Sequence, residues 1–185
     1  ELAVKRVSPE AAGAVAITFD DGYADNHDVA MPILQRHGLT ATIFVATGFL
    51  NGGRMWNDTI IESIRRTTKD ALDLRSIGVD GLGELELNSH DQRRAAIAKL
   101  IGAIKHKHPV ERQALVQAVA DTAAATLPSD LMMSTEQVRA LHGGGMQIGA
   151  HTVTHPILAS LPLSEARQEI AESREVLQAI LGERV

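Results

Sequence analysis

A strand, helix, strand pattern near the start of the chain most constrains its fold. Residues 14–17 are a short run of apolar and β-branched residues, and residues 41–46 are a second such run, so both are predicted strands. Between them, Asp25 or Asn26 can cap a helix that ends near Gly38, a residue suited to the left-handed position after a helix. This order is typical of a parallel sheet and predicts an α/β fold.

Two polar motifs directly follow predicted strands. Thr18-Phe19-Asp20-Asp21-Gly22 follows the first strand, and His151-Thr152-Val153-Thr154-His155 follows another at residues 146–150. Because the residues between the histidines are β-branched and Pro156 comes next, a loop is predicted there rather than a helix. Two imidazoles and one carboxylate can hold a divalent metal and leave positions for water and substrate, as a hydrolytic site requires.

The second carboxylate of the first motif can accept a proton from the attacking water. Asp20 and Asp21 are neighbours, so at the end of a strand they point in different directions and can have different roles. The spacing leaves open which of them binds the metal and which serves as the base. A solvated turn that caps the next helix is the alternative for this pair of carboxylates, and surface or hydrogen-bonded core histidines are the alternative for His151 and His155.

These two motifs resemble those of the NodB-like polysaccharide deacetylases, also called carbohydrate esterase family four. Carried over by position, the resemblance implies that Asp20 is the general base and that Asp21, His151 and His155 hold the metal, with zinc as the expected ion. It also implies metal-assisted removal of N- or O-linked acetyl groups from a sugar or polysaccharide. The implied fold is a distorted (β/α) barrel.

The resemblance covers only part of the family's pattern. The later arginine-containing strand motif, the aspartate and tryptophan segment, and the leucine-x-histidine that supplies a general acid are not found before Val185. We therefore expect residues 1–185 to be the N-terminal part of the domain, a partial barrel truncated before its C-terminal strands. Only three strands are predicted, so an open sheet edge could pair with another copy of the chain.

A helical, alanine-rich stretch separates the second and third strands. Residues 95–104 and 112–125 are predicted as two amphipathic helices joined near Pro109, within an insertion at about 57–134. Three caps are predicted: Asn57-Asp58 for a helix through Ile60 and Ile64, Ser134 for residues 135–141, and Ser164 for the last helix, which runs through Ile170, Val176, Leu177 and Ile180.

Composition excludes several classes of partner. A net charge of -5 without a basic block argues against nucleic acid or an anionic membrane as the main partner, whereas a sugar remains compatible. No apolar run approaches the length of a membrane span. The absence of cysteine excludes disulfides and thiolate metal sites, and it leaves the compartment, bacterial cytoplasm or periplasm, undetermined.

Other residues keep two readings. Trp56, the single tryptophan, either stacks on a sugar ring or anchors the insertion, and Tyr23 either faces the substrate or packs. His106 and His108 imitate the metal-binding pair of the amidohydrolases, but they follow a helix instead of a strand, so a solvated pair is favoured. A metal-dependent amidase of small amides and a non-catalytic metal- or sugar-binding remnant are the alternative functions.

Overall fold

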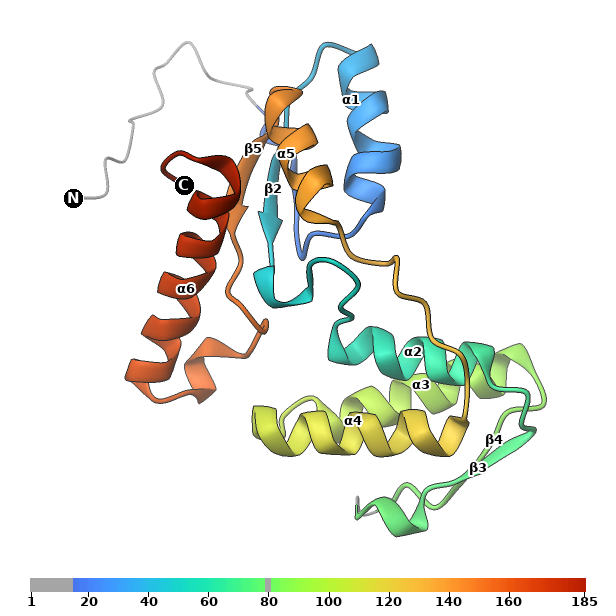
Figure 1. Ribbon diagram of the computed structural model, residues 1–185. Coiled ribbons are helices and arrows are strands. Elements are labelled where there is room, and N and C mark those ends of the chain that lie inside the picture. The colour runs from blue at the N-terminus through green and yellow to red at the C-terminus, as the bar shows by residue number, and fades with distance from the viewer. Residues whose placement is uncertain (1–14, 79–80) are drawn as a thin grey trace.

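Three parallel strands form the sheet in the computed structural model, which describes residues 15–78 and 81–185 (Figure 1). They are β1 (Thr18–Phe19), β2 (Thr42–Val45) and β5 (Gln147–Ala150), in the order β1-β2-β5. The strands predicted at residues 41–46 and 146–150 are therefore confirmed. The first prediction, residues 14–17, is wrong in position, because residues 15–17 are not in a strand and β1 is instead Thr18–Phe19, with Ala14 outside the described residues.

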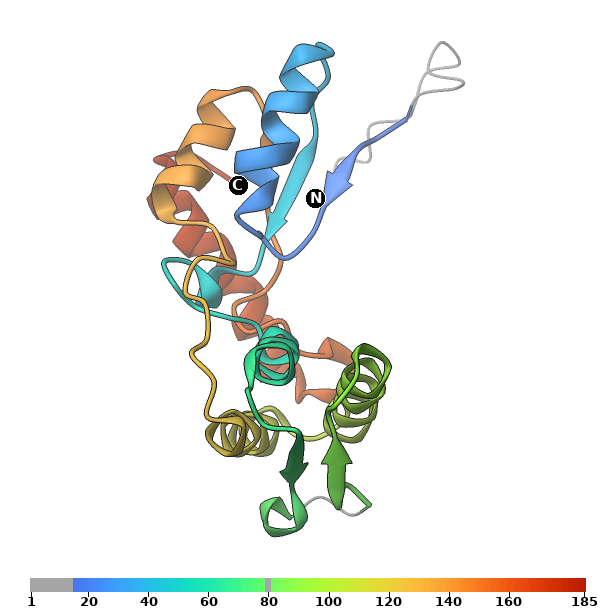
Figure 2. The same ribbon diagram turned by 90° about the vertical axis from the view of Figure 1, so that its right-hand side faces the viewer.

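Helices cover one face of this sheet. They are α1 (Met31–Arg36), which continues a π-helical turn at Asn26–Ala30, α5 (Thr135–Gly143) and α6 (Leu163–Leu181). Figure 2 shows all three on the same side of the strands. The core between them is built from residues of the covered sheet face and of each helix, namely Ile43 and Val45 with Leu34, Val138, Leu141 and Leu177. The other face presents Thr42 and Phe44, which are half-buried.

The segment between β2 and α5 packs as a layer of its own below the sheet (Figure 1). It contains α2 (Trp56–Arg66), β3 (Ala71–Asp73), β4 (Glu84–Glu86), α3 (His90–Ile104) and α4 (Pro109–Ala123). A separate apolar core holds it together, with Ile60, Ile64, Leu72, Leu100, Ile104 and Val116 fully buried. Short 3₁₀ turns lie at Thr47–Phe49, Arg75–Ile77 and Leu158–Ser160.

The antiparallel pair β3–β4 corrects the prediction that this stretch is helical with a loose, glycine-containing part. Leu72 pairs with Leu85 across the two strands, and both are buried. The signal is the alternation of apolar and polar residues at Leu72-Asp73-Leu74 and again at 84–87, which has the period of a strand. The two helices were predicted correctly, although α3 begins earlier, at His90.

Helix caps follow the sequence only in part. Ser134 caps α5 as predicted, in a capping box in which its hydroxyl accepts from the Gln137 N–H and the Gln137 side chain accepts from the Ser134 N–H. The prediction for Asn57-Asp58 is wrong, because α2 begins at Trp56 and Asp58 is buried. Ser164 is also not a cap, since α6 begins at Leu163 after Pro162. Asp25 precedes the first helical turn without a side-chain capping bond.

The strands do not close a barrel within residues 15–78 and 81–185, where β1 and β5 are the edges of the sheet. Pairing between copies through such an edge stays a prediction. Within the same residues, no helix has the length and apolar character needed to cross a membrane.

The capping box gives a test of the fold. Ser134→Ala removes the acceptor for the Gln137 N–H, so the free energy of unfolding should fall by about 1 kcal/mol. Ser164→Ala is the matched control, because Ser164 is exposed in the first turn of α6 and should change stability by less than about 0.5 kcal/mol. Urea unfolding followed by circular dichroism measures both. Equal losses in the two variants would contradict this assignment of the caps.

Candidate metal centre

The end of β2 and the residues after it are hydrogen-bonded to both polar motifs. The Ala46 N–H donates to the Asp21 carbonyl at 3.1 Å, and the His151 N–H donates to the Val45 carbonyl at 3.0 Å. The next residues continue on the histidine side, since Thr47 and Gly48 donate to the carbonyls of Thr152 and Val153. Hydrogen bonds between backbone groups therefore bring the carboxylate and histidine loops to the same end of the sheet.

Three predicted residues meet there. The Asp21 Oδ1 atom lies 3.5 Å from His151 Nε2 and 3.4 Å from His155 Nε2, and the two imidazole centroids are 4.9 Å apart. One potential ligand atom from each residue lies within 4.8 Å of the others. The side chains of Asp21, His151 and His155 are 23%, 33% and 38% exposed, so all three are partly accessible to solvent.

The donor set suits a small divalent cation. Zinc binds imidazole nitrogen and carboxylate oxygen at roughly 2.0–2.2 Å, which separates neighbouring ligand atoms of a tetrahedron by roughly 3.3–3.6 Å. The two separations between the Asp21 oxygen and the histidine nitrogens have this size. Burial lowers the pKa of His155, although the Asp21 carboxylate opposes the shift. A lowered pKa favours the neutral imidazole, the form that binds a metal.

The loops around these ligands are conformationally strained. Asp21, Thr152 and His155 have φ values of 72°, 66° and 51°, in the left-handed region that residues with a Cβ atom seldom adopt. Thr152 is the least expected, because its β-branched side chain clashes there. Strain of this kind persists only where neighbouring contacts impose it, and it gathers at functional sites.

Glu169 of α6 stabilises the conformation of the histidine loop, residues 151–155. Its Oε2 atom accepts from the N–H groups of Val153 and Thr154, each at 2.8 Å, and its Oε1 atom accepts from the Thr154 hydroxyl at 2.6 Å. Within the loop, the Thr152 hydroxyl donates to the His151 carbonyl and accepts from the His155 N–H at 3.1 Å. The carboxylate and the hydroxyl together fix the backbone between the two histidines.

Glu169 is a residue that the sequence analysis missed. It shares one line of α6 with Ser173 and Leu177, spaced by four residues, and both of those are fully buried. Ile170 and Val176, named as apolar positions of this helix, are instead 52% and 41% exposed. A glutamate at a helix position that otherwise faces the interior is therefore the sequence signal that could have identified Glu169.

Asp20 occupies an exposed position directly before Asp21. Its charge opposes the lowering of the pKa of His155, so Asp20 lies within electrostatic range of that imidazole. The turn is tight, since the Gly22 N–H donates to the Asp20 carbonyl at 2.9 Å and Gly22 has a φ of 88°. Asp20 is exposed whereas Asp21 is half-buried, and the different roles expected for the two carboxylates stay a prediction.

Tyr23 connects this turn to the insertion. Its hydroxyl donates to the buried Asp58 carboxylate at 3.0 Å. Burial, and then the nearby Asp58 charge, raise the pKa of the Tyr23 hydroxyl, while burial raises the pKa of Asp58. Of the two readings for Tyr23, the structure supports packing.

The remaining histidines do not join the site. His27 contacts Asp28 and His142 contacts Glu183 at the surface, while His106 and His108 lie in the turn between α3 and α4. In the part of the chain that the structure describes, Asp21, His151 and His155 form the one group of three potential ligands.

Comparison with known proteins identifies the family of this chain. The sequence matches the family described as polysaccharide deacetylase over residues 8–185, so the chain belongs to that family. The family predicted from the two motifs is confirmed. A segment of 31 residues is 58% identical to the Bacillus subtilis (strain 168) protein named "Putative polysaccharide deacetylase YxkH", which covers 17% of this chain and 11% of that protein.

Two solved structures match the chain at low sequence identity. The Streptococcus pyogenes deacetylase PplD in complex with acetate is 19% identical, with a TM-score of 0.48 over 97% of this chain and 51% of that one. The BpsB deacetylase domain from Bordetella bronchiseptica is 16% identical, with a TM-score of 0.44 over 92% of this chain and 52% of that one. The chain spans about half the length of these structures.

Replacing a ligand should empty the site. His151→Ala removes one of the three metal-binding groups, so the affinity for zinc should fall by at least about tenfold. The zinc content after dialysis against a stoichiometric metal buffer should fall accordingly. His106→Ala should leave it unchanged, because His106 lies outside the group. Inductively coupled plasma mass spectrometry measures the metal. Equal metal content in the wild type and His151→Ala would refute the ligand assignment.

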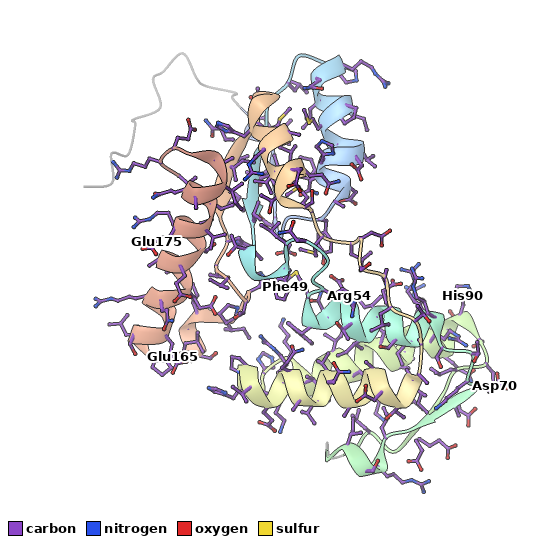
Figure 3. All side chains as sticks on the ribbon, viewed as in Figure 1. Phe49, Arg54, Asp70, His90, Glu165 and Glu175 are labelled. Atoms are coloured by element: carbon purple, nitrogen blue, oxygen red, sulfur yellow. The ribbon has the colours of Figure 1, made fainter. Side chains whose placement is uncertain are left out.

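Glu169 provides a second test, of positioning rather than ligation. Glu169→Ala removes three hydrogen bonds to the histidine loop and should weaken zinc binding by about tenfold. Glu169→Gln keeps one oxygen for the two N–H groups and should recover most of the affinity. Glu175→Ala, on the outer side of α6 in Figure 3, is the control and should bind zinc normally. Wild-type affinity in Glu169→Ala would exclude the role.

Proposed function

We propose that this chain carries the catalytic centre of a metal-dependent hydrolase that removes acetyl groups, N- or O-linked, from a sugar or polysaccharide. The observation that supports it is the convergence of Asp21, His151 and His155 beside a separate, exposed Asp20. Membership of the polysaccharide deacetylase family supplies the substrate class. The same proposal places the three parallel strands in a distorted (β/α) barrel of the whole domain, with residues 57–134 as its insertion.

The residues divide the work as follows. Asp21, His151 and His155 would hold a divalent metal, with zinc as the expected ion. When bound, this metal supplies Lewis acidity that polarises an acetyl carbonyl and lowers the pKa of a water molecule. Asp20 accepts the proton of the attacking water as general base. The departing nitrogen or oxygen needs a proton, which Asp20 can return once it is protonated.

A charge-neutral change at Asp20 separates metal binding from turnover. Asp20→Asn should retain the metal, because Asp21 and the two histidines are intact, but it should lower acetate release by about 100-fold or more, because an amide cannot accept the proton. The whole protein, loaded with zinc, is assayed on an acetylated chitooligosaccharide with enzymatic detection of acetate. Asp25→Asn is the control, since Asp25 is exposed in the following turn.

Three outcomes would change the proposal. Wild-type turnover in Asp20→Asn would assign the base to another residue. Hydrolysis of small cyclic amides without release of acetate from sugars would indicate the amidase alternative. Retained zinc with no turnover on either substrate would indicate a non-catalytic binding protein.

A further inference from the structure

A cavity of about 630 Å³ lies between the insertion and the histidine loop. It is lined by Phe49 after β2, by Trp56 at the start of α2, by the first three turns of α4, and by Thr154, the residue before His155. Figure 3 shows Phe49 in the space between the lower end of the sheet and helices α2 and α4. The cavity therefore adjoins the candidate metal centre without containing its ligands.

Arg112 is the one charged residue among those that line the cavity. The residue is only 6% exposed, and its guanidinium carbon lies 5.0 Å from the centroid of the Trp56 ring. No carboxylate lies within 4.0 Å of this guanidinium in residues 15–78 and 81–185. Glu62, another buried charge of the insertion, does have ionic partners, because it contacts both Arg65 and Arg66. A buried cation without an anion is costly, and the ring contact offsets only part of that cost.

Burial lowers the pKa of Arg112, the direction expected for a cation that lacks a counter-charge. Arg112 also lowers the pKa of His155, so the guanidinium lies within electrostatic range of the metal centre. A ligand that supplied an anion here would reach both the cavity and the reacting group.

We propose that this cavity is a subsite for a carboxylate-bearing sugar adjacent to the acetylated sugar, with Arg112 binding the carboxylate. The inference rests on the proposed function for the sugar class, and it narrows that class to anionic acetylated glycans. Arginine presents a planar pair of donors that matches one carboxylate. A phosphate dianion would call for a second cation, and the lining has none.

The rest of the lining suits a sugar ring. Trp56, Phe49 and Val110 offer apolar surfaces for the ring face, while Gln113, Gln117 and Thr154 offer amides and a hydroxyl for its hydroxyl groups. The adjoining hollow on the other side of Thr154 carries Glu165, Glu169 and Glu172. Its negative charge would repel a carboxylate and so confine it to the Arg112 side.

The single tryptophan makes binding directly measurable. Trp56 fluorescence is titrated with a tetrasaccharide of alternating glucuronate and N-acetylglucosamine, and separately with the same tetrasaccharide after chemical reduction of its carboxylates to alcohols. Both titrations contain chelator, so no turnover occurs. The wild type should bind the anionic probe about tenfold more tightly, the size of one charge-assisted hydrogen bond.

Four variants identify the source of this preference. Arg112→Gln should bind both probes equally, and Arg112→Lys should keep part of the preference because it keeps the charge. Gln113 is an exposed residue of the cavity lining, so Gln113→Glu adds a negative charge there and leaves Arg112 in place. This variant should weaken binding of the anionic probe alone. Arg174→Gln removes one positive charge from an exposed position of α6 and should retain the full preference.

The outcomes separate this inference from the proposed function. Equal affinity of the wild type for the two probes, or a full preference in a folded Arg112→Gln, overturns the subsite even if zinc-loaded protein releases acetate from a neutral chitooligosaccharide. A preference that depends on Arg112 in a protein without acetate release supports the subsite and overturns the hydrolase instead. Thermal melting by circular dichroism establishes that each variant is folded.

Discussion

Backbone pairing of β2 with a strand on each side is the constraint on which the site depends. Thr42 and Ile43 pair with β1, and all four residues of β2 pair with β5. Because the strands are parallel, their carboxyl ends meet at the same end of the sheet. The hydrogen bonds continue past the strands through residues 45–48. Gly48 is required there, since a Cβ atom on it would lie 2.7 Å from the Val153 carbonyl oxygen. Main-chain hydrogen bonds thus bring the two ligand-bearing loops together, and side-chain hydrogen bonds then fix the histidine loop.

This placement carries a conformational cost that the rest of the fold must offset. Left-handed backbone at Asp21, Thr152 and His155 costs on the order of 1–3 kcal/mol at each residue, a large share of the roughly 5–15 kcal/mol that stabilises a domain. The Glu169 carboxylate and the Thr152 hydroxyl counter it with hydrogen bonds to the same loop. α6 therefore has two tasks, because one face buries Leu177 against the sheet and its first turns hold the histidine loop.

The sequence predicts the features that depend on local pattern. Apolar runs with the length of strands, followed at once by Asp20-Asp21 and by His151 and His155, suffice to predict the sheet and the grouping of ligands. Caps are less predictable, because Ser164 and Ser134 look alike in sequence and only tertiary packing decides where each helix begins. Glu169 and Arg112 could not be assigned, since their roles come from contacts across the chain: one with a loop 15 or 16 residues away, the other with a tryptophan 56 residues away.

The candidate metal ligands and the adjoining cavity belong to different layers of the molecule. The loops that carry the candidate ligands are joined by main-chain hydrogen bonds at the carboxyl end of the sheet. The cavity beside them is formed largely by side chains of α2 and α4, which have a core of their own. The Tyr23–Asp58 hydrogen bond joins the layers directly behind the carboxylate turn. In the proposed subsite, substitutions in the cavity would alter which sugar is accepted while Asp21, His151 and His155 keep their positions. The same proposal accounts for the unpaired charge of Arg112, because its partner would arrive with the substrate.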